Sequence, residues 1–237
     1  MRTNARMLSH VRDGNAHVII TAQGEFRTKA LINCAGLQSD RIAQKCGVNP
    51  GLQIVPFRGE YYEIIPEKQY LVKNLIYPVP DPRFPFLGVH FTRRVTGGIE
   101  AGPNAVLAFK REGYRMSSIS PADMLAYGTY SGFYRMAFKF WKTGIGEMYR
   151  SLSKAAFVKA LQVLLPDLKS EDLRRGGAGV RAQALEPDGR LTDDFRIVEA
   201  PGMIHVLNAP SPAATASLSI GKTIAAMAAD RFALQSS

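Results

Sequence analysis

The chain has 237 residues, of which 46% are hydrophobic and 21% charged, as in an ordinary soluble globular protein. Its net charge of +10 would suit an anionic partner, but the basic residues are scattered and form no stripe with interleaved aromatic residues. This pattern argues against a nucleic-acid-binding module. No segment reaches the ~20 continuous apolar residues that span a bilayer, and Met1–Arg12 lacks the apolar stretch of a signal peptide.

The first predicted elements are two short strands, Ala16–Thr21 and Glu25–Lys29, joined by a turn that contains glycine. A third strand, Ala30–Cys34, is apolar and ends at Ala35-Gly36. Ser39 is then expected to cap a short helix that stops before a glycine and a proline.

A proline-rich stretch follows, and it predicts antiparallel sheet over Gln53–Pro103, because prolines at this density break helices and lie at strand ends and edges. Ser120-Pro121 predicts a helix start, with serine as the N-cap and proline at the first position. This helix is expected to run towards Trp141 and to end near Gly144. A second helix is expected over Ser151–Leu165, where apolar residues recur at helical spacing before a proline.

The last third of the chain predicts a glycine-rich loop over Leu173–Asp194, a strand over Met203–Leu207 and a final helix over Ala213–Leu234. Residues Gly177–Ala182 match the spacing G-x-G-x-x-A of a dinucleotide-binding loop. No strand is expected before this match and no helix after it, so we do not interpret it as a nucleotide site.

The order of elements is strand, Ala-Gly turn and helix, then a long antiparallel insert with helices, then strand, turn and helix. A nucleotide-binding core interrupted by a substrate domain would give this order. The predicted fold class is therefore α+β, with a partial FAD-binding, Rossmann-like domain and an antiparallel-sheet substrate domain. The predicted boundaries place residues 1–50 and 195–237 in the first domain and residues 51–194 in the second.

The turn that follows the last strand is a candidate cofactor site. Small residues keep the start of the following helix slim, so its free N–H groups can approach an anion or an electron-rich ring edge. Flavin chemistry needs such a group, because reduction places negative charge near N1 and O2. A small-residue helix packed on a neighbour is the alternative. The candidate residues are Asn208, Ala209, Ser211, Ala213, Ala214 and Thr215.

His90 lies in a predicted strand and is a candidate base for the proton of a substrate hydroxyl group, although a structural histidine is the alternative. His205 lies in an apolar strand, so we expect a packed, hydrogen-bonded core residue. His10 and His17 are expected at the surface. Cys34 and Cys46 belong to no CxxC motif and no Cys/His cluster, so we expect no metal site, a buried Cys34 and a reducing compartment.

Arg58 and Arg181 are candidates for holding a carboxylate, because a guanidinium group offers a bidentate fork. Either arginine could equally be a structural ion-pair partner. Weaker candidates of the same kind are Tyr61, Tyr62, Tyr77 and Lys110-Arg111.

Aromatic and basic residues alternate at helical spacing over residues 130–142. Such a face suits a membrane interface. A core face whose lysine and arginine side chains extend along it to solvent fits nearly as well.

Six segments, spread over nearly the whole chain, are specific as sequences: LINCAGLQSDRIA, IVPFRGEYYEI, IYPVPDPRFPFLGVHFT, GPNAVLAFKREGY, GVRAQAL and NAPSPAATASL. Together they resemble the L-2-hydroxyglutarate dehydrogenase/oxidase branch of the D-amino-acid-oxidase-like (DAO) FAD-dependent oxidoreductases. The resemblance implies oxidation of the 2-hydroxyl group of this dicarboxylate to 2-oxoglutarate, with FAD as the cofactor. Electrons would pass to a quinone or to oxygen, and family members are often in peripheral contact with a membrane.

The resemblance also assigns residues. Ala35 and Gly36 correspond to the family's second FAD-contacting turn, and Asn208–Thr215 to the turn beside the flavin pyrimidine. Four residues fall where the substrate domain faces the flavin, and these are the candidates for catalysis and substrate binding: His90, Arg181, Arg58 and Tyr77.

The family's amino-terminal βαβ unit with its glycine loop has no counterpart in this sequence, so we expect the chain to be the carboxyl-terminal part of a longer enzyme. The alternatives are another DAO-like 2-hydroxy-acid or amino-acid oxidase, or a non-catalytic remnant that binds a membrane or a partner protein. The implied location is cytoplasmic, either free or on the inner face of a membrane, and mitochondrial in a eukaryote.

Overall fold

The computed structural model describes residues 1–79 and 88–232, and the chain divides into two compact units. The first unit comprises Met1–Ile54, Gln183–Pro187 and Leu191–Ser237, and the second comprises Val55–Ala182 and Asp188–Arg190. Sequence patterns placed the boundaries after residues 50 and 194. The second boundary differs because one long strand, β9 (Leu173–Leu185), begins in the second unit and ends in the first.

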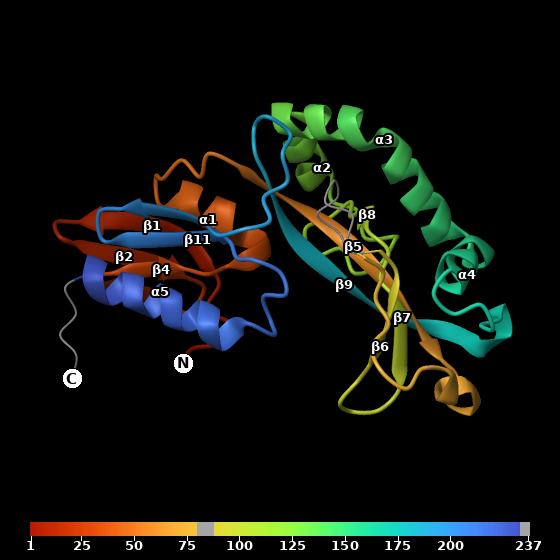
Figure 1. Cartoon of the computed structure of the whole chain (residues 1–237). Helices are drawn as coiled ribbons and strands as arrows, with labels where there is room; N and C mark the ends of the chain where they lie inside the picture. The colour runs from red at the N-terminus through yellow and green to blue at the C-terminus, as the bar shows by residue number, and fades with distance from the viewer. Residues whose placement is uncertain (80–87, 233–237) are drawn as a thin grey trace. The chain divides into compact units, whose positions relative to one another are not determined.

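The first unit contains two small sheets (Figure 1). One is an antiparallel meander of β1 (Met7–Asp13), β2 (Ala16–Thr21) and β3 (Gly24–Thr28). The other has the order β10 (Arg196–Ala200), β11 (Met203–Asn208) and β4 (Leu31–Asn33), with β4 parallel to β11. The predicted hairpin and the two apolar strands are confirmed, whereas β1 and β10 were not predicted.

The two faces of β11 pack against different elements, because alternate side chains of a strand point to opposite sides. Ile204 and Val206 contact the apolar side of α5 (Ser217–Arg231). Met203 contacts Leu31 of β4 and residues of α1 (Ser39–Lys45) and the meander. Burial on both faces explains why this strand is a continuous apolar run in the sequence.

The helices of the first unit start differently from the prediction. A short 3₁₀ turn, η1 (Gly36–Gln38), precedes α1, and Gln38 rather than Ser39 is the N-cap. The Ser39 hydroxyl group donates to the Leu207 carbonyl oxygen at 3.4 Å, so it links α1 to β11 instead of capping the helix. The final helix begins at Ser217, after a turn that covers residues 213–216.

The second unit is built on a five-stranded sheet, as predicted for the proline-rich stretch. Its central strand β5 (Gln53–Ile64) is antiparallel to β7 (Ile99–Gly102) and β8 (Val106–Leu107), and β6 (His90–Arg93) is antiparallel to β7. β9 pairs with β5, and the 3₁₀ turn η2 (Pro66–Leu71) follows β5. The expected strand over FLGVHFT begins in residues 80–87, which lie outside the described residues.

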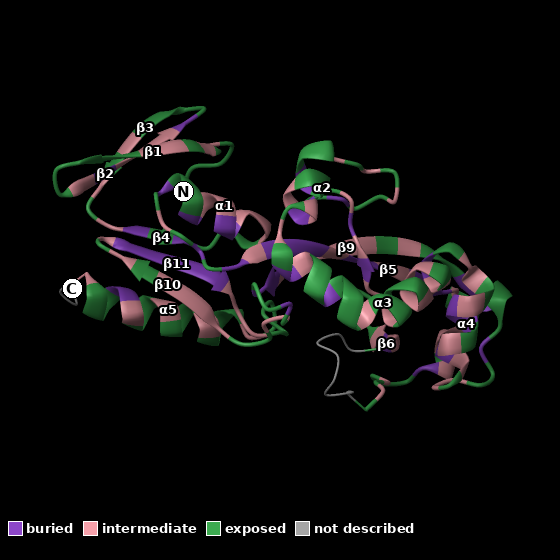
Figure 2. Ribbon diagram, turned by 90° about the horizontal axis from the view of Figure 1, so that it is seen from above, coloured by how far each residue is buried: buried purple, intermediate pink, exposed green. Residues whose placement is uncertain are grey.

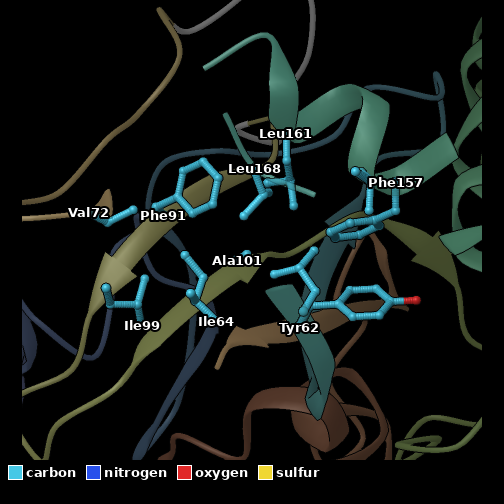
Figure 3. Packing of buried hydrophobic residues seen from close by; sticks show 11 residues of the cluster. Tyr62, Ile64, Val72, Phe91, Ile99, Ala101, Phe157, Leu161 and Leu168 are labelled. Atoms are coloured by element: carbon cyan, nitrogen blue, oxygen red, sulfur yellow. The ribbon is translucent and has the colours of Figure 1, made fainter. Parts of the chain in front are cut away.

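Helices cover one face of this sheet, where the main core cluster forms (Figure 3). Tyr62, Phe91 and Ala101 point from three neighbouring strands towards Phe157 and Leu161 of α4 (Lys154–Gln162). The rings of Tyr62 and Phe157 are 4.8 Å apart between centroids.

The helical region breaks at Tyr130 and at Ser153, whereas the sequence patterns predicted one break between Gly144 and Ser151, within what is α3 (Ser131–Leu152). The second predicted helix corresponds to α4. α2 (Pro121–Gly128) starts as predicted, with the Ser120 side chain accepting from the Asp123 amide, but it ends well before Trp141. The extended Tyr130 separates it from α3, which has an irregular turn at Phe140. α4 then begins after Ser153, whose side chain accepts from the Ala156 amide.

The prediction of a glycine-rich loop over Leu173–Asp194 is wrong for residues 173–185 and correct for residues 186–194, which contain the turn at Pro187-Asp188. After the 3₁₀ turn η3 (Ser170–Asp172), residues 173–185 form β9. Pairing with β5 stabilises this strand despite its low β-propensity, because strand formation depends more on partners than on intrinsic preference. The match Gly177–Ala182 lies within β9, so the structure agrees that it is no nucleotide-binding loop.

Candidate functional site

The face of the second unit's sheet that is turned away from α4 carries polar side chains. Alternation along β6 places Phe91 in the core and therefore His90 and Thr92 on the opposite face. The same rule places Glu100 of β7 and Tyr61 of β5 there, since Ala101 and Tyr62 lie in the core. Two predicted candidates, His90 and Tyr77, contact each other on this face, and the charge of a third, Arg181 of β9, acts on His90.

His90 is held by its neighbours on two sides. Its Nδ1 atom lies 2.9 Å from the Gly88 carbonyl oxygen, and its ring stacks on Tyr77 with centroids 4.3 Å apart and planes inclined by 21°. The Tyr77 hydroxyl group shares a 3.0 Å hydrogen bond with the hydroxyl group of Thr92. Thr92 therefore fixes Tyr77, and Tyr77 fixes the orientation of the imidazole ring.

These contacts also determine which nitrogen of His90 carries the proton. A carbonyl oxygen only accepts hydrogen bonds, so Nδ1 must donate to Gly88, and Nε2 of the neutral ring keeps its lone pair. Burial lowers the pKa of His90; the hydrogen bond to Gly88 opposes this shift, and the nearby charge of Arg181 adds to it. The ring is therefore neutral at pH 7, with Nε2 available as a base.

Arg181 lies in β9 and interacts electrostatically with Tyr61. Burial lowers the pKa of this guanidinium group, against an opposing influence from Tyr61. Burial also raises the pKa of Tyr61, so its hydroxyl group remains protonated. A desolvated guanidinium beside a phenol donor and a neutral imidazole is suited to binding an anion that carries a hydroxyl group.

Arg58 is placed apart from this group. Its side chain is 2% exposed and contacts Glu60 at 3.2 Å and the Met116 sulfur at 2.9 Å. Glu60 in turn accepts a hydrogen bond from Ser151 of α3, so Arg58 and Glu60 lie on the helix-covered face of the sheet. Arg58 therefore has the structural ion-pair role that the sequence left open.

In the first unit, the Ala35-Gly36 turn follows β4 and is braced by Asn33. The Asn33 side-chain oxygen accepts from the Ala35 amide at 3.1 Å, and its nitrogen donates to the Ser39 carbonyl oxygen at 2.8 Å. The same nitrogen lies 3.0 Å from Nδ1 of His205, which is fully buried as predicted. Gly36 has φ +51°, and a Cβ there would meet no atom within 4 Å, so the turn presents an open surface.

The second candidate cofactor segment is the turn before α5. Asn208 donates its side-chain amide to the Asp194 carbonyl oxygen at 2.7 Å, so this side chain braces a loop. Ala209 is half-buried, and the four candidates after it are exposed: Ser211, Ala213, Ala214 and Thr215.

The start of α5 has the chemistry that a flavin edge requires. Its N-cap, Ala216, forms no side-chain capping bond, and the first turn contains no acidic residue. In the part of the chain that the structure describes, the amides of residues 213–215 donate no hydrogen bond. Free amide donors and the positive end of the helix dipole are both favourable to negative charge, so these residues fit FAD.

Three expectations about single residues are wrong. His17 is fully buried and half-buried His10 lies 2.9 Å from it between ring nitrogens, because β1 and β2 pair and pack on the rest of the unit. Cys34 is exposed, since it follows the last residue of β4.

Among residues 1–79 and 88–232, no group of three or more His, Cys, Asp or Glu side chains is arranged to hold a metal ion.

An exposed apolar stripe runs along α3, which is largely green in Figure 2. Its members recur every three or four residues and are each at least 54% exposed. We call this set the α3 stripe: Tyr134, Phe138, Trp141, Ile145, Tyr149 and Leu152. Lys139 and Lys142 lie beside it, each with its ammonium group over a neighbouring aromatic ring. Over the described residues, no helix is both long and apolar enough to cross a bilayer.

Sequence reasoning missed three residues that shape these sites: Thr92, Glu100 and Asn33. Thr92 is two residues after His90 in a strand, and that spacing alone indicates a shared face. Glu100 could be placed only through the pairing of β6 with β7. Asn33 interrupts an apolar strand, and a buried amide next to a tight turn signals a hydrogen-bonding role.

Comparison with known proteins places these features in a family. Residues 1–227 match the DAO family, described as FAD dependent oxidoreductase. The L-2-hydroxyglutarate dehydrogenase of Indibacter alkaliphilus is 59% identical over 92% of this chain and 55% of its own length. The mitochondrial L-2-hydroxyglutarate dehydrogenase of Caenorhabditis elegans is 56% identical over 90% of this chain and 50% of its own length. The chain thus spans about half the length of the curated relatives it matches.

Two solved structures share the fold. FAD-bound L-α-glycerophosphate oxidase of Mycoplasma pneumoniae has a TM-score of 0.61 at 17% identity, over 91% of this chain and 48% of its own. L-amino acid deaminase of Proteus myxofaciens has a TM-score of 0.51 at 15% identity, over 89% of this chain and 48% of its own. The expectation of an α+β, DAO-like fold is confirmed.

Proposed function

Because the chain belongs to the DAO family of FAD-dependent oxidoreductases, we propose that it is part of an enzyme that oxidises L-2-hydroxyglutarate to 2-oxoglutarate. The observation that carries the proposal is the grouping of His90, Tyr77 and Tyr61 on one face of one sheet, where the charge of Arg181 acts on His90 and Tyr61. The names of the relatives support the choice of substrate.

Arg181 is the proposed carboxylate-binding residue. Its guanidinium group is desolvated, and a charge-assisted bond is stronger in such surroundings than at a surface. Tyr61 keeps its proton and can donate a second hydrogen bond to the same substrate group. Arg58 is not proposed for this role, since it is paired with Glu60 on the other face.

His90 is the proposed base. The Gly88 carbonyl group holds the proton on Nδ1, so Nε2 accepts the proton of the substrate hydroxyl group while the C2 hydrogen leaves as hydride. Tyr77 keeps the ring in this orientation and covers one of its faces. Bound FAD supplies the two-electron acceptor for that hydride.

We propose that the first unit holds part of the cofactor and that the second unit binds the substrate. Ala35 and Gly36 offer an open turn, and residues 213–215 offer free amides at the start of α5. Asn208 would contribute through its backbone, because its side chain is bonded to Asp194. The other candidates in this segment, Ala209 and Ser211, would line the same turn.

For the electron acceptor we favour a membrane quinone over oxygen. The α3 stripe with its flanking lysines has the aromatic, cationic character of a helix that lies in a membrane interface. Peripheral attachment would bring the enzyme to a lipid-dissolved acceptor, on the inner face of a membrane or in the mitochondrion of a eukaryote.

Anaerobic stopped-flow reduction of the full-length flavoprotein that contains this chain tests the reaction. We expect L-2-hydroxyglutarate to bleach the flavin absorbance much faster than D-2-hydroxyglutarate, L-lactate or L-alanine. Fastest reduction by L-alanine or L-lactate would instead indicate another oxidase of the DAO family. A flavin that none of these substrates reduces would favour the non-catalytic alternative.

A further inference from the structure

The polar face of the second unit's sheet carries two carboxylates that face each other. The register of β5 and β7 pairs Glu63 directly with Glu100. Like charges in this position destabilise an antiparallel pair. Arg94 bridges them, with one guanidinium nitrogen 2.9 Å from Glu63 and another 3.3 Å from Glu100. A single guanidinium group thus contacts the carboxylates of both strands.

The two carboxylates do not depend on Arg94 to the same extent. Glu63 has a second cation, since Arg174 contacts it at 2.7 Å and 2.9 Å through two nitrogens. Within the described residues, Arg94 is the only cation within ion-pair distance of Glu100. Loss of Arg94 would therefore leave Glu100 as an uncompensated negative charge.

Glu100 belongs to the same face as the proposed substrate site. In the register of β6 and β7 it is paired with Thr92, the residue that bonds Tyr77, and the next pair on this face is His90 with Gly102. The charge of Glu100 also acts on Tyr61, whose pKa is raised chiefly by burial and further by this carboxylate. An anionic substrate bound at Arg181 and Tyr61 would experience the same field.

The turn between β6 and β7 is shaped to hold Arg94 in place. The backbone amide of Arg94 donates to the Gly98 carbonyl oxygen at 3.0 Å, and Gly98 has φ +85°. A Cβ at Gly98 would lie 3.0 Å from a guanidinium nitrogen of Arg94. The guanidinium group therefore packs over the glycine, and the positive φ makes any other residue unfavourable there.

We propose that Arg94 is a specificity-determining residue that lets the site accept a substrate with two carboxylates by neutralising Glu100. The inference rests on the proposed function, because it concerns the same site. An uncompensated negative charge repels a dianion about twice as strongly as a monoanion at the same distance. Arg94 acts through Glu100 and need not touch the substrate.

The test compares binding of glutarate, a dicarboxylate, with butyrate, a monocarboxylate, by calorimetry on the full-length flavoprotein. Arg94→Gln should weaken glutarate binding roughly tenfold and butyrate binding roughly threefold, the ratio expected for one added charge near a dianion and a monoanion. The double variant Arg94→Gln/Glu100→Gln should restore both affinities to within about twofold, because it removes the charge that Arg94 compensates.

Arg93→Gln is the matched control. It removes the same formal charge from the residue next to Arg94, and the Arg93 side chain donates to the Val72 carbonyl oxygen. It should leave the ratio of the two affinities unchanged, and thermal melts of all variants verify folding. Equal losses for both ligands in Arg94→Gln, no recovery in the double variant, or no glutarate binding by the unmodified protein would each overturn the inference. A protein that binds glutarate with this pattern but does not oxidise L-2-hydroxyglutarate would refute the proposed function alone.

Discussion

At the scale of single residues, partners distinguish arginines that look alike in the sequence. Arg58 and Arg181 both follow apolar residues in strands, yet Arg58 contacts Glu60 on the helix-covered face, whereas Arg181 interacts electrostatically with Tyr61. The difference arises from the groups that surround each side chain in the folded sheet. Local sequence does not show this difference, because it does not indicate which face is buried.

The pH dependence of flavin reduction tests the role of His90. A base must be deprotonated to act, so the rate should rise with pH through the pKa of His90 and become constant above it. Burial lowers that pKa, so we expect the acid limb below the ordinary histidine value of about 6.5. His90→Asn should remove the limb and slow reduction by about 10²–10⁴-fold with FAD still bound.

Stopped-flow reduction across pH 5 to 9 or so gives both quantities. Thr92→Val is a useful companion variant, because it removes the hydroxyl group that bonds Tyr77 and leaves His90 intact. We expect a smaller rate loss with the acid limb retained. An unchanged reduction rate in His90→Asn would move the base elsewhere and leave His90 as a structural residue.

At the scale of elements, sequence patterns identified the strands and helices whose ends are set by turn or capping residues next to them. The hairpin of β2 and β3 has its turn glycine, and α2 has its serine cap and first-turn proline, so the hairpin and the start of α2 were predicted correctly. β9 was missed because its glycines and arginines favour a loop, and only pairing with β5 makes it a strand. The break between α2 and α3 contains no proline, but Gly128 and Ser131 are residues typical of a helix end and a helix start, and the single helix that was expected overlooked them.

The α3 stripe gives a prediction about membranes. Phe138→Ser/Trp141→Ser should weaken binding to vesicles that contain anionic lipid, because a buried aromatic side chain contributes about 1.5–3 kcal/mol. Lys139→Gln/Lys142→Gln should weaken binding by about 1 kcal/mol per lysine, and only when anionic lipid is present. Co-sedimentation of the full-length protein with vesicles of zwitterionic and anionic composition measures both effects.

Val163→Ser is the matched control, because Val163 is also a highly exposed apolar residue but lies outside the α3 stripe. It should leave vesicle binding unchanged. Equal binding by the aromatic double variant and the control would mean that this face meets another surface, and the choice of a quinone as acceptor would lose its support.

At the scale of the whole chain, the order of elements predicts two domains, and the structure divides into two compact units whose boundaries differ from the predicted ones. Each unit has a core of its own, around Phe91 and Phe157 in one and around β11 in the other. Residues 183–187 join the first unit through the end of β9, and no change in composition marks that point. Short-range patterns indicate elements, but the allocation of a crossing strand depends on contacts distant in sequence.

The 237-residue chain purified by itself should contain no flavin. Its first unit offers one open turn at Gly36 and one helix start at α5, which fit parts of the cofactor. The sequence has no G-x-G-x-x-G loop between a strand and a helix, and such a loop provides the main binding site for the pyrophosphate in this architecture. A visible absorption spectrum of the purified chain checks the prediction, and circular dichroism establishes that the chain is folded.

The matched control is the same chain preceded by the amino-terminal half of the Indibacter alkaliphilus relative, which should purify yellow. A near-stoichiometric flavin peak in the chain alone would show that the two segments of the first unit hold FAD without a glycine loop.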